Sequence, residues 1–387
     1  MPRSPCSRRT FLVASAGLGL CALTPQHANA SPTSSRLPIQ GQTARSDVAA
    51  QVEDLVNLVT RSGVSGRERS RNPLDDLRLS SEAIDEVQNW SQFSQRIDQS
   101  LRDDGILASD FCVSYASEHV LESSNYKYHL VNLLVEKKLD SGLVWSSSLP
   151  ILLTFDNRDA VVRYNAIDTD WDSVIAQTNG LVTPSMICLD SPTPVLDLPS
   201  TSDSDIERML RAEHMLGTAS VRALGGNGRM AAAAYANKYW NSYNRGYRDF
   251  SSNSYGGDCT NFVSQCMRAG GWSDTGSLLD RTNDKAWFYW KVTQSYSWVN
   301  VGIFRSFSIK HGRSKLAQNV TQMWHGNVIQ VAVNGTWYHS TIVTGRSNNL
   351  PLLTYHTNNV HNRPFYSFRE SFSRAHPGGL TWALHLT

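Results

Sequence analysis

A cysteine stands directly after two glycines and an aspartate at residues 256–259, and these residue types in this order suit nucleophilic catalysis. Asp258 is a favourable helix N-cap residue, and the apolar spacing that follows it predicts a helix ending at Gly270. A thiol in the first turn of a helix feels the positive end of the helix dipole, which lowers its pKa and favours the thiolate. The sequence therefore indicates Cys259 as a nucleophile, whereas Cys266, on the apolar face, indicates core packing.

A cysteine nucleophile requires a base, and two later strand-like runs carry histidines. Alternation along the strands places His339 on one face of the first run, and His356 with Asn358 on one face of the second. If the second strand pairs back on the first, these side chains meet on one side of the sheet. A helix carrying Cys259 on that side then completes a Cys–His–polar set.

The hairpin signal between the strands sets the expected pairing. Asn334-Gly335 is the strongest short signal for a two-residue hairpin loop, and counting outward from it pairs Gln330 with His339. The return loop that follows is expected to pair His339 with His356. Asn358 then lies a diagonal step away, so His356 is the expected orienter of the base, and a slip of two residues would favour Asn358 instead.

Several short runs add a more specific signal, and they are Tyr235-Ala236, Tyr239-Trp240, the DCTNFVSQC run at 258–266, Val328-Ile329-Gln330, the HSTIVT run at 339–344 and Tyr355-His356-Thr357. Together they resemble the "putative amidase" domain of secreted bacterial proteins, from about residue 228 to 387. That family is grouped with the CHAP-like and papain-like cysteine hydrolases. One departure is Asn327, where such domains usually carry aspartate.

The resemblance implies a papain-like fold, Cys259 as nucleophile, His339 as base, and a third member at or near His356. It also implies that the substrate is an amide bond of cell-wall peptide or a related peptide. The expected mechanism is a thiolate attack that forms an acyl-enzyme, which water then hydrolyses. No cofactor is expected.

The first 30 residues have the features of an export signal. Arg8-Arg9 precede an apolar stretch at residues 13–23, and Ala28-Asn29-Ala30 fits an A-x-A cleavage site. The stretch is shorter than the roughly 20 residues that span a bilayer. We therefore expect a secreted protein, exported by the twin-arginine route, with no membrane span after the signal is removed.

Charge gives no indication of a nucleic-acid partner. Residues 1–30 hold three arginines and no acidic residue, so the mature chain has 33 basic and 34 acidic side chains and a formal charge of −1. A near-neutral chain has no global basic field for nucleic acid. The expected partner is a peptide or peptidoglycan-type substrate, and no oligomeric state is indicated.

Composition predicts an α+β protein of two domains. Residues 31–46 are expected to be a disordered linker, and 191–205, rich in Pro, Ser and Asp, a second linker between the domains. Residues 47–190 predict an N-terminal helix-plus-antiparallel-sheet domain of unassigned role, and 206–387 the papain-like domain. The expected N-terminal elements are helices at 47–60 and 81–101 and strands at 111–115, 126–135, 149–155 and 160–164.

Alternatives remain open at this point. A zinc site could use the same cysteines and histidines, although they lack paired C-x-x-C spacing. The domain could also be a binding module on a degenerate hydrolase scaffold, or a transferase that passes the acyl group to an amine. Cys112 and Cys188 could form a disulfide, and the aromatic residues at 287–298 could line a groove or fill a core.

Overall fold

The computed structural model describes residues 46–61, 77–168, 171–183, 186, 223–250, 258–290 and 293–387. The chain from Arg45 onward belongs to one compact unit. The predicted signal peptide, the linker at 191–205 and all but residue 46 of the first linker lie outside the described residues. So do residues 204–216, where the sequence predicts a helical stretch. Within the described ranges, no helix combines the length and apolar character needed to cross a membrane.

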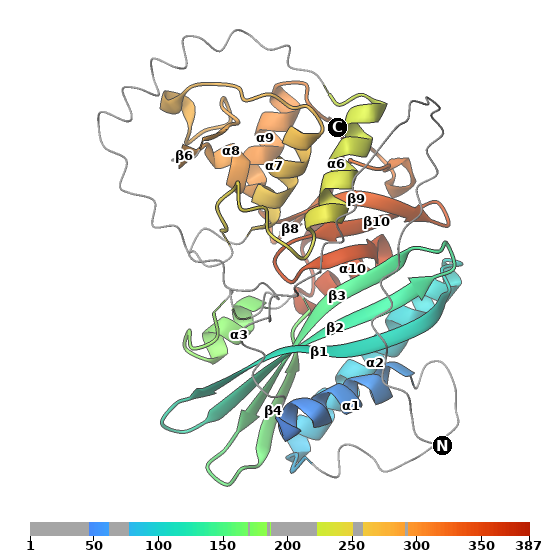
Figure 1. The fold of residues 1–387 in the computed structure, drawn as a ribbon, viewed down its shortest axis with the longest axis vertical. Coiled ribbons are helices and arrows are strands. Elements are labelled where there is room, and N and C mark those ends of the chain that lie inside the picture. The colour runs from blue at the N-terminus through green and yellow to red at the C-terminus, as the bar shows by residue number, and fades with distance from the viewer. Residues whose placement is uncertain are drawn as a thin grey trace, which may run out of the picture. The chain divides into compact units, whose positions relative to one another are not determined.

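The N-terminal half has the helices and strands that the sequence predicts, with longer strands (Figure 1). Ser80 caps the second helix by accepting the backbone N–H of Ala83 at 3.2 Å, and the buried side of that helix packs on the sheet through residues such as Val87 and Trp90. The elements are α1 (Asp47–Arg61), α2 (Ser81–Asp103), β1 (Ala108–Glu122), β2 (Lys127–Leu139), β3 (Val144–Phe155), β4 (Val161–Ala166) and α3 (Trp171–Gln177).

The C-terminal half places helices before, between and after its strands. The elements are α6 (Gly226–Tyr239), α7 (Cys259–Ala269), the 3₁₀ turns η2 (Leu278–Asp280) and η3 (Val320–Gln322), β5 (Tyr289–Trp290), β6 (Thr293–Gln294), α8 (Tyr296–Val299), α9 (Val301–Lys310), β7 (Lys315–Leu316), β8 (Val328–Val333), β9 (Thr336–Ser347), β10 (Leu350–Tyr355), β11 (Val360–Pro364), α10 (Phe365–Ala375) and β12 (Leu380–Leu386). The sequence does not predict α3, the elements between α7 and β8, or β11, α10 and β12.

One antiparallel sheet runs through both halves. Its order is β1-β2-β3-β11-β10-β9-β8-β12-β7, with β4 added on β3, so ten of the described strands belong to it. Strand β3 pairs with β11, Val360 opposite Ser147 and His361 opposite Ser146. Mixed helices with antiparallel strands confirm the predicted α+β class. The division into two domains remains a prediction.

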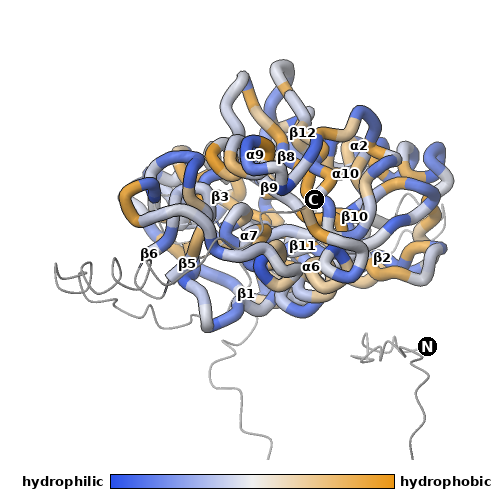
Figure 2. Tube along the Cα trace, turned by 90° about the horizontal axis from the view of Figure 1, so that it is seen from above, coloured by the Kyte–Doolittle hydropathy of each residue, from blue (hydrophilic) through white to orange (hydrophobic). Residues whose placement is uncertain are grey.

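The C-terminal strands separate two hydrophobic cores. Val328 and Ile342 face the α7 side and pack with Phe262, whereas their neighbours Ile329 and Val343 pack on the other side with the phenylalanines of α10. Adjacent strand residues point to opposite faces, so each strand contributes to both cores. Hydrophobic segments accordingly recur along the strands in Figure 2.

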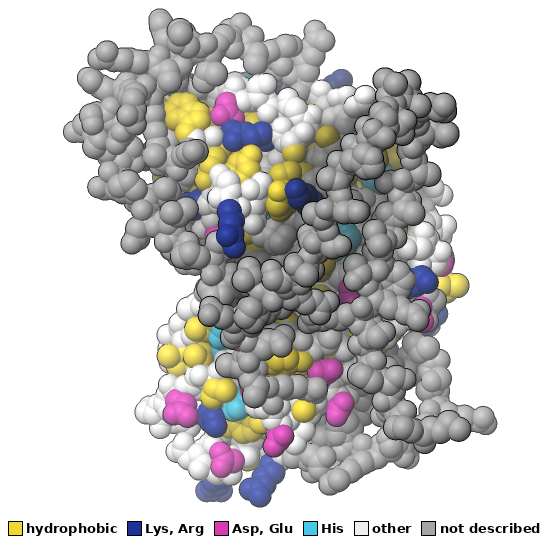
Figure 3. Space-filling model, in the orientation of Figure 1, with side chains coloured by type: hydrophobic (Ala, Val, Ile, Leu, Met, Phe, Trp, Pro, Cys, Tyr) yellow, Lys and Arg dark blue, Asp and Glu magenta, His cyan; other side chains and the backbone are white. Residues whose placement is uncertain are grey.

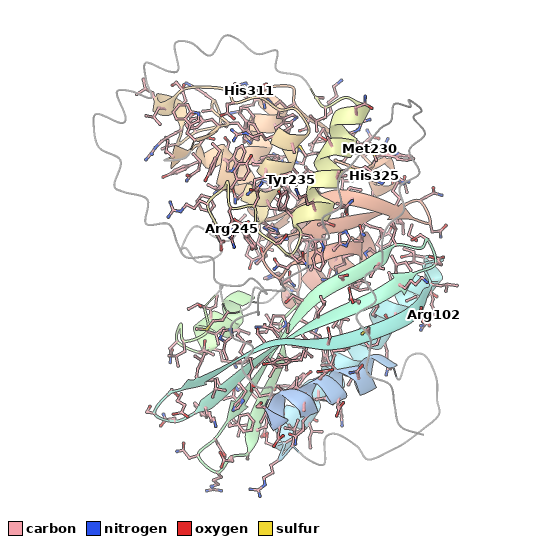
Figure 4. All side chains as sticks on the ribbon, viewed as in Figure 1. Arg102, Met230, Tyr235, Arg245, His311 and His325 are labelled. Atoms are coloured by element: carbon pink, nitrogen blue, oxygen red, sulfur yellow. The ribbon has the colours of Figure 1, made fainter. Side chains whose placement is uncertain are left out.

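Two glycines let α6 lie close against α7. A Cβ on Gly270 would be 2.8 Å from the Gly228 carbonyl oxygen, closer than atoms of these kinds approach. Tyr235 lies on α6 (Figure 4). Its hydroxyl donates to the side chain of Gln265 on α7 at 2.7 Å, which adds a polar link between the two helices. This packing brings the end of α6, at Tyr239, towards the start of α7.

Candidate active site

Cys259 is the first residue of α7, and its side chain is buried. Its sulfur lies 3.8 Å from Thr260 Oγ1, and the backbone N–H groups of Ser340 and Thr260 also stabilise its charged form. Burial outweighs these donors and raises the pKa of the thiol to about 11. The predicted low pKa is therefore wrong for this conformation, because the prediction included the helix dipole and left out burial.

Asp258 occupies the N-cap position, but its side chain does not cap the helix. Its Oδ1 accepts the backbone N–H of Phe250 at 3.0 Å and the side-chain amide of Asn261 at 2.7 Å. Its Oδ2 lies 2.7 Å from Nδ1 of His356. The carboxylate is fully buried, so its role is to hold the histidine rather than to begin the helix.

The His356 ring lies between two aromatic side chains. Its centroid is 3.8 Å from that of Phe262 and 4.2 Å from that of Tyr243, and both contacts are stacked. Nε2 lies 2.9 Å from the backbone carbonyl oxygen of Tyr239. A carbonyl oxygen can only accept, so Nε2 carries a hydrogen in this structure.

The proton between Asp258 and His356 is shared within a neutral pair. With Nε2 protonated, two arrangements are possible: an imidazolium whose Nδ1–H donates to the Asp258 carboxylate, or a neutral ring whose Nδ1 accepts a hydrogen bond from a protonated Asp258. Burial raises the pKa of Asp258, while the hydrogen bond and charge of His356 oppose that shift. Either arrangement leaves no net charge, which allows the pair to be fully buried.

His339 lies on the opposite face of the sheet. Its ring packs against Tyr355, Phe368 and Phe372, with centroid distances of 4.9, 5.9 and 5.9 Å. Burial in this apolar surrounding lowers the pKa of His339 to about 3. The structure therefore brings His356, and not His339, to the helix that carries Cys259.

Two one-residue changes of register explain this difference from the prediction. The Asn334-Gly335 hairpin is confirmed, with Val333 opposite Thr336, but an irregularity then places His339 opposite Val331 instead of Gln330. On the other side of β9, Val343 pairs with Leu353 and Gly345 with Leu352, whereas the prediction paired Val343 with Leu352. A slip of one residue turns a side chain to the other face of a sheet.

Asn358 follows His356 in the same turn but does not join the pair. Its side-chain amide donates to the backbone carbonyl of Asp168 at 2.7 Å. The turn also contains Thr357 with φ 109° and Asn359 with φ 49°, a sharp reversal between β10 and β11. The structure thus gives Asn358 a contact with the N-terminal half in place of the predicted role beside a base.

The aromatic region at 287–298 mostly fills the core. Trp287 and Trp298 are fully buried with centroids 4.6 Å apart, and the guanidinium of Arg268 lies 4.4 Å from the Trp298 ring centroid. Tyr296 is the exposed exception. On the face shown in Figure 3, hydrophobic, basic and acidic side chains are interspersed.

Sequence reasoning missed the polar neighbours of the cysteine. Asp258 was treated as a cap, and Thr260 and Ser340 were treated only as parts of a motif. Their positions beside Cys259 and His339 in the two most specific runs were the available signal. In the ranges that the structure describes, His, Cys, Asp and Glu side chains do not gather in groups of three or more that could hold a metal ion. Cys188 lies outside those ranges, so its pairing with Cys112 stays a prediction.

Comparison with known proteins supports an amidase-like domain. Residues 226–375 match the family described as "Putative amidase domain". The chain is 31% identical over 149 residues to the uncharacterized protein YhbB of Bacillus subtilis, covering 37% of this chain and 45% of that protein. It is 30% identical over 161 residues to the uncharacterized protein YjcM of the same organism, covering 38% of this chain and 35% of that protein. The similarity thus spans less than half of each curated relative, and no solved structure matches.

Proposed function

We propose that the C-terminal half is a cysteine-dependent amidase, with Cys259 as nucleophile and His356, held by Asp258, as the acid–base residue. The observation that carries the proposal is the buried Asp258–His356 pair, whose Oδ2 and Nδ1 lie 2.7 Å apart and whose aspartate directly precedes Cys259 in the chain. The aspartate supplies the third group that orients a catalytic histidine. The family match at residues 226–375 supports the same reaction class.

The donors around the sulfur support the choice of nucleophile. Ser340 N–H, Thr260 N–H and Thr260 Oγ1 each favour the charged form of Cys259. Donors of this kind stabilise a thiolate more than a thiol, since the thiolate accepts the stronger hydrogen bonds. The first turn of α7 adds the positive end of its dipole.

The reaction begins when the His356 ring leaves the Tyr239 carbonyl and Nε2 releases its hydrogen to solvent, which leaves Asp258 as a carboxylate that accepts from Nδ1–H. The free Nε2 then takes the thiol proton. The sulfur then attacks the amide carbonyl, and the backbone N–H of Cys259 helps to hold the oxyanion. His356 returns the proton to the leaving amine, which leaves a thioester on Cys259. Water, deprotonated by His356, hydrolyses the thioester and releases the acid. Hydrogen bonds of catalytic groups commonly tighten only when substrate is bound.

The proposed substrate is a cell-wall peptide or a related peptide, and the proposed location is outside the cytoplasm. The location rests on the arginine pair, apolar stretch and A-x-A site of residues 1–30.

The experiment is digestion of purified peptidoglycan by the mature protein, with the cleaved bond identified by mass spectrometry. Activity should be lost in Cys259→Ala and retained in Cys266→Ala, a matched buried cysteine on the same helix. Added amine in the same digest tests for acyl transfer, because a transferase would yield the amide of that amine. Hydrolysis that survives Cys259→Ala would refute the proposed nucleophile.

A second candidate function is a non-catalytic binding module. The observation that favours it is the burial of Cys259, which raises the thiol pKa to about 11 in this conformation. Iodoacetamide separates the two candidates. An amidase should be alkylated at Cys259 below pH 8 and should be protected by a bound substrate analogue, whereas an inert thiol should stay unmodified with and without the ligand.

A further inference from the structure

A buried chain of hydrogen bonds leads from the last strand to Cys259. Ser314 Oγ lies 3.0 Å from His385 Nδ1, and His385 Nε2 lies 3.0 Å from Gln330 Oε1. Gln330 Nε2 donates to Ser340 Oγ at 3.0 Å, and Ser340 Oγ lies 3.0 Å from Thr260 Oγ1. All five side chains are buried, and the last of them reaches Cys259 Sγ at 3.8 Å.

Counting the hydrogens on each side chain gives one consistent direction for these hydrogen bonds. The backbone carbonyl of Val301 accepts one hydrogen of Gln330 Nε2 at 3.1 Å, and Ser340 Oγ accepts the other. Gln330 Oε1 must therefore accept from His385 Nε2–H. Ser340 Oγ accepts from Gln330, and its single hydrogen can then be donated to Thr260 Oγ1.

The last step places a donor on the sulfur. When Thr260 Oγ1 accepts from Ser340, its own hydrogen can be directed to Cys259 Sγ, the contact that favours the charged form of the thiol. The chain crosses four elements, from β12 through β8 and β9 to α7. Gln330, Ser340 and Thr260 lie in the motif runs of the sequence, whereas no sequence pattern indicates His385.

We propose that Gln330, held by His385, is a positioning residue that keeps Ser340 and Thr260 oriented as hydrogen-bond donors to the Cys259 sulfur. This inference rests on the proposed function, since it concerns the same nucleophile. Gln330 does not touch the sulfur, and it acts through Ser340. The titratable groups close to Cys259 are Asp258, from the turn before α7, and His356, from the turn after β10, and both stay unchanged in the variants below.

The test measures the rate at which iodoacetamide modifies Cys259 in the folded protein at pH 8, by mass spectrometry of the peptide that contains it. Gln330→Met keeps the side-chain length and removes both hydrogen-bonding groups. Loss of one oriented donor raises a thiol pKa by about one unit, so alkylation should become about tenfold slower. A change that only loosens the fold would expose Cys259 and make alkylation faster.

Thr341→Val is the matched control. Thr341 lies next to Ser340 on β9, and its hydroxyl donates to the Ile329 carbonyl at 3.0 Å, on no path to the cysteine. Its loss removes a buried hydrogen bond of the same kind, and alkylation should not slow. A rate in folded Gln330→Met equal to or above that of the unaltered protein would overturn the proposal.

Two substitutions of His385 provide the same test if Gln330→Met does not fold. His385→Leu removes the donor to Gln330 and should slow alkylation about threefold, whereas His385→Gln retains an amide N–H there and should restore the rate. Equal rates in both would contradict the proposal. Peptidoglycan hydrolysis is measured in parallel. If the unaltered protein hydrolyses nothing but alkylation is slower in the variants, the positioning role is supported and the amidase is refuted. If the unaltered protein hydrolyses peptidoglycan but alkylation is not slower in the variants, the amidase is supported and the positioning role is refuted.

Discussion

Asp258→Asn tests the proposed acid–base pair with almost no change of shape. In the structure Asp258 Oδ1 accepts from Phe250 N–H and from the Asn261 amide, and an asparagine oxygen can accept both. The new amide nitrogen then faces Nδ1 of His356 in place of Oδ2, which lies at 2.7 Å. The amide can only donate there, so Nδ1 becomes an acceptor.

The substitution therefore fixes the wrong tautomer. Nε2 already carries a hydrogen because it faces the Tyr239 carbonyl at 2.9 Å. In the unaltered protein the Asp258 carboxylate can hold a proton on Nδ1, which frees Nε2 once its hydrogen has left. With Nδ1 accepting from the asparagine, Nε2 keeps its hydrogen and cannot take the proton of Cys259. Loss of the orienting carboxylate of a catalytic histidine costs about 10²–10⁴ in rate, equivalent to roughly 3–5 kcal/mol of transition-state stabilisation.

Stability should change far less than activity. The variant exchanges charge-assisted hydrogen bonds for neutral ones, and it also removes the cost of burying a charged carboxylate. These effects oppose each other, so we expect the free energy of unfolding to stay within about 1 kcal/mol of the original. Urea denaturation followed by circular dichroism measures this value on the same preparation.

The assay is kcat/KM for the amide bond identified in the peptidoglycan digest, with Asp274→Asn as control. Asp274 is a partly buried carboxylate paired with Arg268 and has no contact with His356. Its substitution should leave the rate within about threefold. A folded Asp258→Asn protein that retains more than a tenth of the original kcat/KM would refute the tautomer argument.

Three further substitutions test other parts of the structure. His339→Phe should leave kcat/KM unchanged because the ring packs against Tyr355, Phe368 and Phe372 on the face of the sheet away from α7. Burial lowers the pKa of His339 to about 3, so the neutral ring stabilises the fold above the unfolded pKa and this contribution is lost as the pH falls. Phenylalanine does not titrate. Between pH 7 and 5 the variant should therefore lose about 2 kcal/mol less of its free energy of unfolding than the unaltered protein does, as measured by urea titration. Asp168→Asn removes one partner of a bidentate pair with buried Arg363, at 2.6 and 2.9 Å, and should cost about 2–4 kcal/mol, whereas Asp284→Asn, in an exposed pair, should cost under about 1 kcal/mol. Cys266→Ala should cost about 1–2 kcal/mol by leaving a small cavity, with hydrolysis retained.

The sequence predicts those parts of the fold that depend on local chemistry. The cap at Ser80, the turn at Asp140-Ser141-Gly142 and the Asn334-Gly335 hairpin each follow from residues within a few positions, and the structure has all three. The N-terminal strands follow from alternation in the same way. The motif runs likewise indicate that Cys259 and His356 belong to one candidate site, although the sequence shows no contact between them.

The remainder depends on register and burial, which local patterns do not determine. Counting from a correct hairpin gave the wrong face for His339 because one irregularity beside Val331 displaces every later pair by one residue. The pKa of Cys259 is predicted from its helix position alone, whereas burial decides the sign of the shift against the donors of Ser340 and Thr260. His385 joins the site only because β12 lies beside β8, a long-range pairing with no signature in its own residues.

The pairing of β3 with β11 has a consequence for any shortened form of the protein. In the full chain β11 is an inner strand, with β3 on one side and β10 on the other. A fragment that begins near α6 would turn β11 into an edge strand whose outer N–H and C=O groups have no intramolecular partner. Exposed edges of this kind recruit strands from other molecules, so such a fragment is expected to aggregate or form strand-exchanged dimers. Solubility of the isolated amidase-like half therefore depends on covering that edge.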